Sequence, residues 1–232
     1  MERVLERARA DTGRLTLGAT ALLLIGVAAA CWVTTAQRLQ GMDMSPSIEL
    51  GGLGWFAVTW ALMMAAMMLP SLVPAAWVSR GAATFTAGYL ALWTVAGLVA
   101  WAVVDGVRSE HIGWLAWDRA GRWLAAAALL AAAAYQLSAA KGDCLDRCRA
   151  PDSRGGLRGG ARHGLSCVGC CAGLMVALFA LGVMSLTWMV AVAALIAAER
   201  LLPWHAPAVH GVAVTLGALA VWMAVAPGGV PG

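Results

Sequence analysis

The sequence predicts an all-α protein, a polytopic transmembrane helix bundle with six or seven spans, in a single integral membrane domain covering residues 1–232. Hydrophobic residues make up 61% of the chain and charged residues only 12%, with a mean hydropathy of +0.77. Apolar stretches also recur at lengths that cross a hydrocarbon core of about 30 Å. A soluble domain of this length would need a larger polar surface. The lipid bilayer is therefore the expected partner, and no nucleic-acid partner is expected.

The spans follow from the apolar stretches and the charges between them. The predicted spans are residues 15–36, 55–78, 83–104, 123–140, 167–183, 185–201 and 206–226. The first is longer than the apolar region of a signal peptide, about 7–15 residues, so it is predicted to stay as an anchor. The uncharged run 168–198 holds 31 residues, or about 46 Å as one helix. Two helices with a turn near residues 182–185 give seven spans, and one tilted or kinked helix gives six.

The distribution of lysine and arginine predicts the orientation, because short cytoplasmic loops carry the excess of these residues. An inside N-terminus in the seven-span arrangement leaves four of the 16 cationic residues outside. Those four are Arg38, Arg108, Arg119 and Arg122. The N-terminus and the cysteine-rich loop are therefore expected in the cytoplasm.

Five of the six cysteines lie at the two ends of one basic segment, residues 141–166. They are Cys144, Cys148, Cys167, Cys170 and Cys171. On helical backbone, spacings of three and four residues place each group on one face. Antiparallel neighbouring helices would bring the two faces together. The segment itself is rich in glycine and arginine, which predicts a flexible connection without a core.

Thiolate and thioether ligands favour Cu(I) and Zn(II) over magnesium or calcium. His163, four residues before Cys167, could add an imidazole, although a lone histidine in a basic loop is more often solvated. A single cysteine in a membrane helix is usually packing material. Five confined to two helix ends favour a metal site over that interpretation.

Methionines give a second indication of soft-metal chemistry. Four of them, Met63, Met64, Met67 and Met68, crowd the second span, and Met175 follows the cysteines into the membrane. Thioethers on successive turns could pass a soft cation along a helix, although methionine is also a common packing residue. Together with the cysteines they favour copper over zinc.

Polar residues within the apolar stretches are few. Gln136 could form a hydrogen bond across helices near the site, and Glu199 and Arg200 are expected to pair at a helix end. The chain carries no Ser/His/Asp constellation, no phosphate-binding lysine motif and no dinucleotide glycine pattern. No catalytic residue is predicted, and ATP-driven pumping by this chain is not expected.

Several unusual motifs resemble a known family. They are residues 60–70 (WALMMAAMMLP), 135–137 (YQL), 144–151 (CLDRCRAP), 164–171 (GLSCVGCC) and 199–201 (ERL). In this order they resemble DUF2182, a bacterial family of uncharacterised integral membrane proteins described as metal-binding. The resemblance implies the bacterial cytoplasmic (inner) membrane as location. The chain departs from the family pattern at Ser185, where Asn is usual, and at Arg200, where Lys is usual.

The sequence thus predicts a membrane protein that binds a thiophilic metal, Cu(I) with zinc as the alternative, for metal transport, delivery or homeostasis. A metal chaperone or a cuproenzyme is the expected protein partner. Two alternatives stay open: a membrane thiol-disulfide oxidoreductase that uses the same cysteines, and a structural membrane subunit in which they are incidental.

Overall fold

The structure is a computed structural model, and it describes residues 2–39, 52–79, 81–109, 117–150, 155–181, 185–202 and 205–225. Within these ranges the chain forms helices and no strand, which confirms the predicted all-α class. The helices are α1 (Glu2–Leu39), α2 (Leu53–Val78), α3 (Ala82–Ser109), α4 (Trp117–Gln136), α5 (Ala139–Arg149), α6 (Gly156–Leu181), α7 (Leu186–Leu201) and α8 (His205–Val225).

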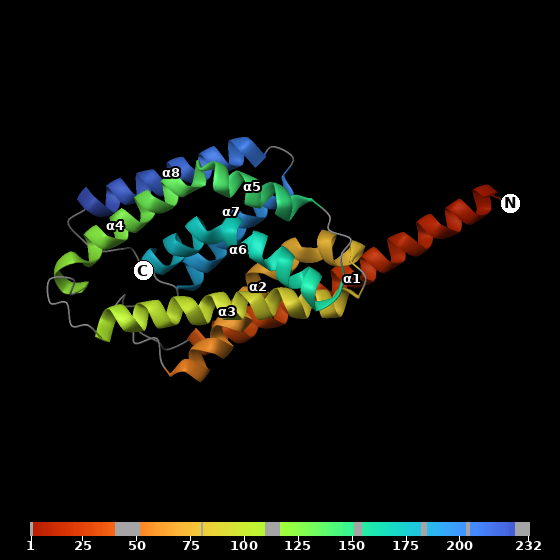
Figure 1. The fold of residues 1–232 in the computed structure, drawn as a ribbon, viewed down its shortest axis with the longest axis horizontal. Helices are drawn as coiled ribbons and strands as arrows, with labels where there is room; N and C mark the ends of the chain where they lie inside the picture. Colours follow the sequence, from red (N-terminus) through yellow and green to blue (C-terminus); the bar gives the residue numbers. More distant parts are fainter. Residues whose placement is uncertain are drawn as a thin grey trace.

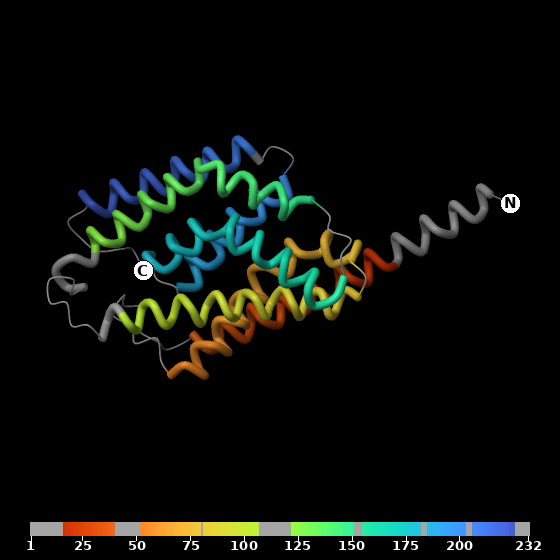
Figure 2. Tube along the Cα trace, viewed as in Figure 1, coloured from red at the N-terminus to blue at the C-terminus, as the bar shows by residue number. Residues whose placement is uncertain are grey.

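Helix α6 lies at the centre of the bundle, between α3 on one side and α4 with α5 on the other (Figures 1 and 2). Helix α8 runs beside α4, and α2 packs against α1, α3 and α7. Helix α2 continues unbroken through Pro70 and Pro74. The interior is apolar and rich in methionine, since Met64, Met68 and Met189 are fully buried.

Among the residues that the structure describes, five helices are long and apolar enough to cross a membrane, and the bent pair formed by α4 and α5 gives a sixth candidate span. Helix α7 has 16 residues, or about 24 Å at 1.5 Å per residue, which is short for a span. The uncharged run 168–198 is not one helix, because α6 ends at Leu181 and α7 begins at Leu186. Two separate helices therefore occupy this run, as the two-helix interpretation expected. The turn itself, residues 182–184, lies outside the described residues, and the count of seven spans stays a prediction.

The predicted flexible connection between residues 141 and 166 is wrong over most of its length. Helix α5 begins after Ser138, whose hydroxyl accepts a hydrogen bond from the Lys141 backbone nitrogen at 3.2 Å and so caps the helix. The axis bends by 64° between α4 and α5. Residues 156–166 form the first turns of α6 rather than a tether; residues 151–154 lie outside the described part of the chain.

Glycine explains why this arginine-rich segment is packed. A methyl group on Gly160 would lie only 1.9 Å from the carbonyl oxygen of Phe85, and one on Gly88 would lie 2.1 Å from that of Leu157. Only glycine lets the backbones of α3 and α6 approach so closely, as in other membrane helix pairs. Gly160 of this segment and Gly88 of α3 therefore serve helix packing.

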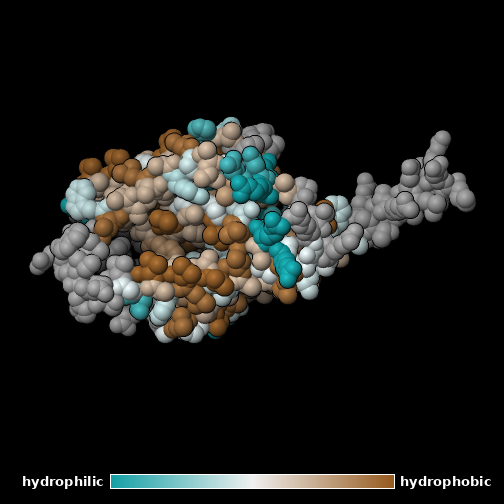
Figure 3. All heavy atoms as spheres, viewed as in Figure 1, coloured by the Kyte–Doolittle hydropathy of each residue, from teal (hydrophilic) through white to brown (hydrophobic). Residues whose placement is uncertain are grey.

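The surface is consistent with a lipid environment. Large apolar side chains face outward on several helices, including Leu22, Val214 and Val225. In the view of Figure 3, hydrophobic atoms cover most of the bundle, and hydrophilic atoms gather over α5 and the first turns of α6. These two segments thus mark a polar end of the bundle, and the cysteines lie next to it.

Candidate metal centre

Three buried cysteines form a compact group of sulfur atoms. Cys148 of α5 meets Cys167 and Cys170 of α6, and the three Sγ atoms all lie within 4.8 Å of one another. Their side chains are 6%, 0% and 2% exposed. The predicted convergence of the two cysteine motifs is therefore present in the structure for these three residues.

Helical spacing and the bend before α5 explain the convergence. Cys167, Cys170 and Cys171 share one face of α6, because residues three and four apart are neighbours on a helix. The bend lays α5 against α6, so Cys148 comes within 3.6 Å of the Cys170 sulfur. Cys171 lies beside the group, with its sulfur 3.6 Å from that of Cys170 and 3.9 Å from that of Cys167.

The spacing suits a thiophilic metal. Sulfur ligands about 2.3 Å from a tetrahedral ion lie about 3.8 Å apart, close to the 3.6 Å between the Cys148 and Cys170 sulfurs and within the 4.8 Å that bounds the three-cysteine group. The donors in the three-cysteine group are sulfur alone, which favours soft ions such as Cu(I) or Zn(II). The burial of the group also keeps out water. The residues present therefore fit such an ion with little rearrangement.

Arg200 of α7 brings a positive charge to this sulfur cluster. Its guanidinium Nη1 lies 3.3 Å from the Cys167 sulfur and donates a hydrogen bond to the Ser71 hydroxyl at 2.8 Å. The side chain is only 7% exposed, and a buried charge requires compensation. A metal bound by thiolates carries net negative charge and would supply it. The Tyr89 hydroxyl also lies 3.1 Å from the Cys167 sulfur.

His163 does not belong to the three-sulfur group. Its Nε2 lies 3.2 Å from Nη2 of Arg200, and its ring lies against Phe85 and Tyr89 with centroids 5.7 Å and 5.9 Å away. The expectation of a solvated histidine is wrong, since the residue is 4% exposed. Its observed contacts place it beside the guanidinium, and its role as a ligand stays a prediction.

The other predicted ligands lie around this centre. Cys144, one turn before Cys148 on α5, is half-buried and lies against Gly169, where an added methyl group would be 2.6 Å from its sulfur. The thioethers of Met63, Met64, Met67 and Met68 are buried in α2, and Met175 is buried on α6. Ligand roles for Cys144 and the methionines stay predictions.

A second polar network holds α5 against α7. The Lys141 ammonium and the Glu199 carboxylate form an ion pair at 2.7 Å with both side chains buried. Gln136 donates a hydrogen bond to the same carboxylate at 3.0 Å. The expected pairing of Glu199 with Arg200 is therefore wrong, because adjacent residues on a helix point in different directions. Gln136 does form the predicted contact across helices.

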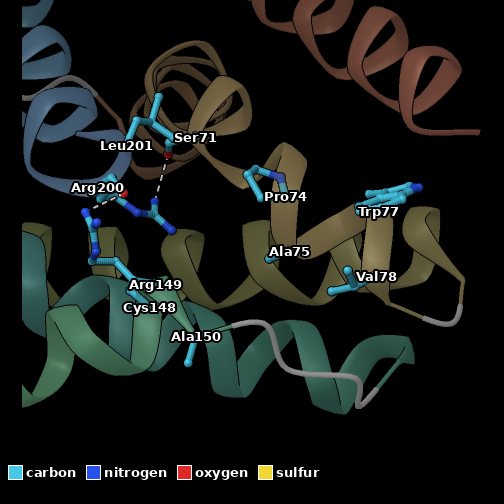
Figure 4. A pocket seen from close by; sticks show the side chains of 10 residues that line it. All are labelled: Ser71, Pro74, Ala75, Trp77, Val78, Cys148, Arg149, Ala150, Arg200 and Leu201. Atoms are coloured by element: carbon cyan, nitrogen blue, oxygen red, sulfur yellow. Dashed lines mark hydrogen bonds between the residues drawn. The ribbon is translucent and has the colours of Figure 1, made fainter. Parts of the chain in front are cut away.

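A pocket of about 310 Å³ lies beside the cluster, between α2, α5 and α7. Cys148, Arg149 and Arg200 line it together with Ser71 and apolar residues that include Trp77 (Figure 4). Arg149 donates from Nη1 to the main-chain oxygens of Glu199 and Arg200, each at 2.8 Å. The pocket thus reaches the cysteine group at Cys148.

Sequence reasoning missed Tyr89 and the approach of Arg200 to Cys167. Nothing near Tyr89 in the sequence marks it, because its contact with Cys167 joins residues 78 apart. A signal did exist for the Lys141 network: Glu199 is the last acidic residue of the chain and stands in an apolar stretch. An intramembrane carboxylate of this kind calls for a buried cation as its partner.

Comparison with known proteins gives one match. The sequence model of a family described as "PpoB2: Copper chaperone" matches residues 57–223, which include every helix of the cluster and its polar network. No curated protein and no solved structure matches. The match confirms the expected copper-related family, while the assignment to DUF2182 stays a prediction.

Proposed function

The chain belongs to the PpoB2 family of copper chaperones, and from this premise we propose that it receives Cu(I) at Cys148, Cys167 and Cys170 and hands it on for cuproenzyme assembly or copper homeostasis. The observation that carries the proposal is the buried group of three sulfurs within 4.8 Å. Cys171, with its sulfur 3.6 Å from that of Cys170, provides a further donor for exchange.

Charge supports a metal at this position. Cu(I) held by two of the three cysteines as thiolates, with the third as a neutral thiol, carries one negative charge, which the buried guanidinium of Arg200 balances at 3.3 Å from Cys167. Zn(II) with three thiolates has the same net charge, so the balance does not separate the two ions. Membership of a copper-related family favours Cu(I).

The methionines offer a route away from the cysteines. Met63, Met64, Met67 and Met68 follow successive turns of α2, and the same helix contributes Ser71, which holds Arg200 at 2.8 Å. Neutral thioethers bind Cu(I) and are stable in an apolar interior. In the proposed direction, the ion moves from the cytoplasmic cluster along α2, with Met175 of α6 as a further donor, toward the outer face of the bacterial inner membrane.

The orientation belongs to the same proposal. The excess of arginine and lysine on one side of the predicted spans supports a cytoplasmic N-terminus and a cytoplasmic α5. The proposed partners are a copper-carrying molecule on the inside and a cuproenzyme that accepts the ion.

A thiol-disulfide oxidoreductase is the second candidate, because the Cys148 and Cys170 sulfurs lie only 3.6 Å apart on different helices. It would form a reversible disulfide and bind no metal. Mass spectrometry of the purified protein after mild oxidation and reduction, with and without one equivalent of Cu(I), separates the two candidates. Protection of the cysteines by Cu(I) supports the chaperone, and disulfide cycling unaffected by Cu(I) supports the oxidoreductase.

Proteoliposomes test the transfer step. Cu(I) is added outside, and a chromophoric Cu(I) chelator trapped inside reports its arrival under anaerobic conditions. The variant with all four α2 methionines changed to Leu should keep cluster binding and lose transfer. A matched variant with outward-facing Val58 and Val95 changed to Leu should transfer normally. Unchanged transfer in the methionine variant would refute the relay.

A further inference from the structure

The pocket beside the cluster has the features of a binding site for the molecule that delivers the metal. It is lined by a sulfur of the metal-binding group, by two arginines and by apolar walls. Its volume of about 310 Å³ lies at the lower end of the range of about 300–1,000 Å³ for small-molecule sites. A ligand of a few tens of atoms fits this space, whereas a folded protein domain does not.

The burial of the cysteines gives the order in which a metal would meet them. Cys148, at 6% exposure, lines the pocket, while Cys167 and Cys170 lie deeper at 0% and 2%. An ion that enters from the pocket therefore meets the Cys148 sulfur first. The Cys170 sulfur is 3.6 Å further on, close enough to take part in the next exchange.

The charges that line the pocket select an anion. Arg149 and Arg200 both contribute to its wall, and no acidic residue does so in the described part of the chain. Figure 4 shows the two side chains on the same side of the pocket, at the Cys148 end. Arg149 uses Nη1 for its two main-chain bonds, and the rest of its guanidinium fork carries further donors in a plane that matches a carboxylate.

We propose that this pocket binds a small anionic thiol, a thiol compound with free carboxylates, as the carrier that brings Cu(I) to Cys148. The inference rests on the proposed function and adds the class of molecule from which the metal comes. Arg149 holds a carrier carboxylate, and the apolar wall with Trp77 accommodates the rest of the molecule. The carrier sulfur then lies next to the Cys148 sulfur.

The transfer is a ligand exchange without a change of oxidation state. A bond forms between Cys148 Sγ and Cu(I), and the bond between Cu(I) and the carrier sulfur breaks. The proton that leaves the Cys148 thiol is taken up by the released carrier thiolate. Copper stays Cu(I) throughout, so the step needs no oxidant or reductant.

Stopped-flow uptake of Cu(I) by the purified, reduced protein tests the proposal, with glutathione as the anionic thiol and 2-mercaptoethanol as the neutral one. For wild type, uptake from the glutathione complex should saturate with carrier concentration. Arg149→Gln should slow this uptake about tenfold, the effect of one charge-assisted hydrogen bond, and leave uptake from 2-mercaptoethanol unchanged. Arg147→Gln, an exposed arginine on the same helix outside the pocket lining, is the matched control and should behave as wild type.

A second variant keeps both charges. Ala150 is an exposed residue of the pocket lining, so Ala150→Trp should fill the pocket and slow uptake from the glutathione complex with the arginines in place. S-methylglutathione, which has the carboxylates without the free thiol, should compete with the glutathione complex in wild type. Equal competition by inorganic phosphate would assign the pocket to phosphate-bearing ligands such as lipid headgroups and overturn the proposal.

The outcomes of these experiments distinguish a failure of this inference from a failure of the proposed function. If wild type binds Cu(I) from both carriers and neither Arg149→Gln nor Ala150→Trp changes the glutathione rate, the pocket is not the carrier site although the metal centre stands. If wild type takes up no Cu(I) from either carrier, the proposed function itself fails.

Discussion

Replacing Arg200 by Met removes the buried cation that contacts the Cys167 sulfur, and it should weaken Cu(I) binding strongly. The guanidinium lies 3.3 Å from that sulfur. For two full charges at this distance and an effective dielectric constant of about 20, Coulomb's law gives 332/(20 × 3.3), or about 5 kcal/mol. A bis-thiolate Cu(I) complex spreads its one negative charge over two sulfurs, so about half of this energy applies. The expected loss is about 2–3 kcal/mol, or roughly 30- to 150-fold in affinity.

The affinity is measured by competition with a chromophoric Cu(I) chelator, anaerobically and in detergent. Arg200→Lys is the control, because an ammonium keeps the charge but cannot hold Ser71, Cys167 and His163 in one planar fork. It should lose about tenfold or less. Gel filtration and helical circular dichroism establish that both variants are folded. An Arg200→Met affinity within threefold of wild type would refute the counter-charge argument.

Three further substitutions test the packing and the polar contacts around the centre. Gly160→Ala forces apart α3 and α6, because the added methyl would lie 1.9 Å from a carbonyl oxygen, and it should lower the free energy of unfolding, measured by thermal unfolding, by about 1–3 kcal/mol. The control Gly142→Ala, whose added methyl meets no atom within 4 Å, should be neutral or stabilising. Equal melting points for the two variants would contradict the close approach of α3 and α6. Lys141→Met leaves the buried Glu199 carboxylate without its cation 2.7 Å away and should destabilise the protein by about 3–5 kcal/mol. The double variant that adds Glu199→Gln should recover much of this loss. If it recovers none, the unpaired carboxylate is not the cause of the destabilisation. Tyr89→Phe keeps the ring but removes a hydroxyl 3.1 Å from the Cys167 sulfur, so chelator competition should show a loss of about fivefold in Cu(I) affinity. An unchanged affinity would show that this hydroxyl does not contribute to metal binding.

The fold class was accessible from sequence because lipid-facing helices need long apolar stretches, and each described candidate span overlaps a predicted one. The structure of the region between α4 and α6 could not be predicted from sequence in this way. Its glycines and arginines are typical of a flexible linker, and only the packed structure reveals that Gly160 serves the contact with α3. Local composition cannot distinguish a glycine that makes a segment flexible from one that lets a neighbouring helix pack closely against the backbone.

The centre was predictable to the extent that helical spacing determines it. The one-face arrangement of Cys167, Cys170 and Cys171 follows from positions i, i+3 and i+4. The same rule put Cys144 and Cys148 together on α5, yet only Cys148 enters the three-sulfur group, and Cys144 lies against Gly169 instead. Contacts made by Tyr89 depend on packing between distant segments, which spacing along one helix does not reveal.

Metal content tests the central claim most directly. Copper and zinc are measured by elemental analysis of protein purified reduced and anaerobically after loading with Cu(I). The comparison is a variant with Cys148, Cys167 and Cys170 changed to Ser, and the control is Cys31→Ser, which replaces a half-buried cysteine of α1 outside the group. The account predicts about one copper per chain in wild type and in the control, lost in the triple variant. Copper retained at wild-type stoichiometry in the triple variant would contradict it.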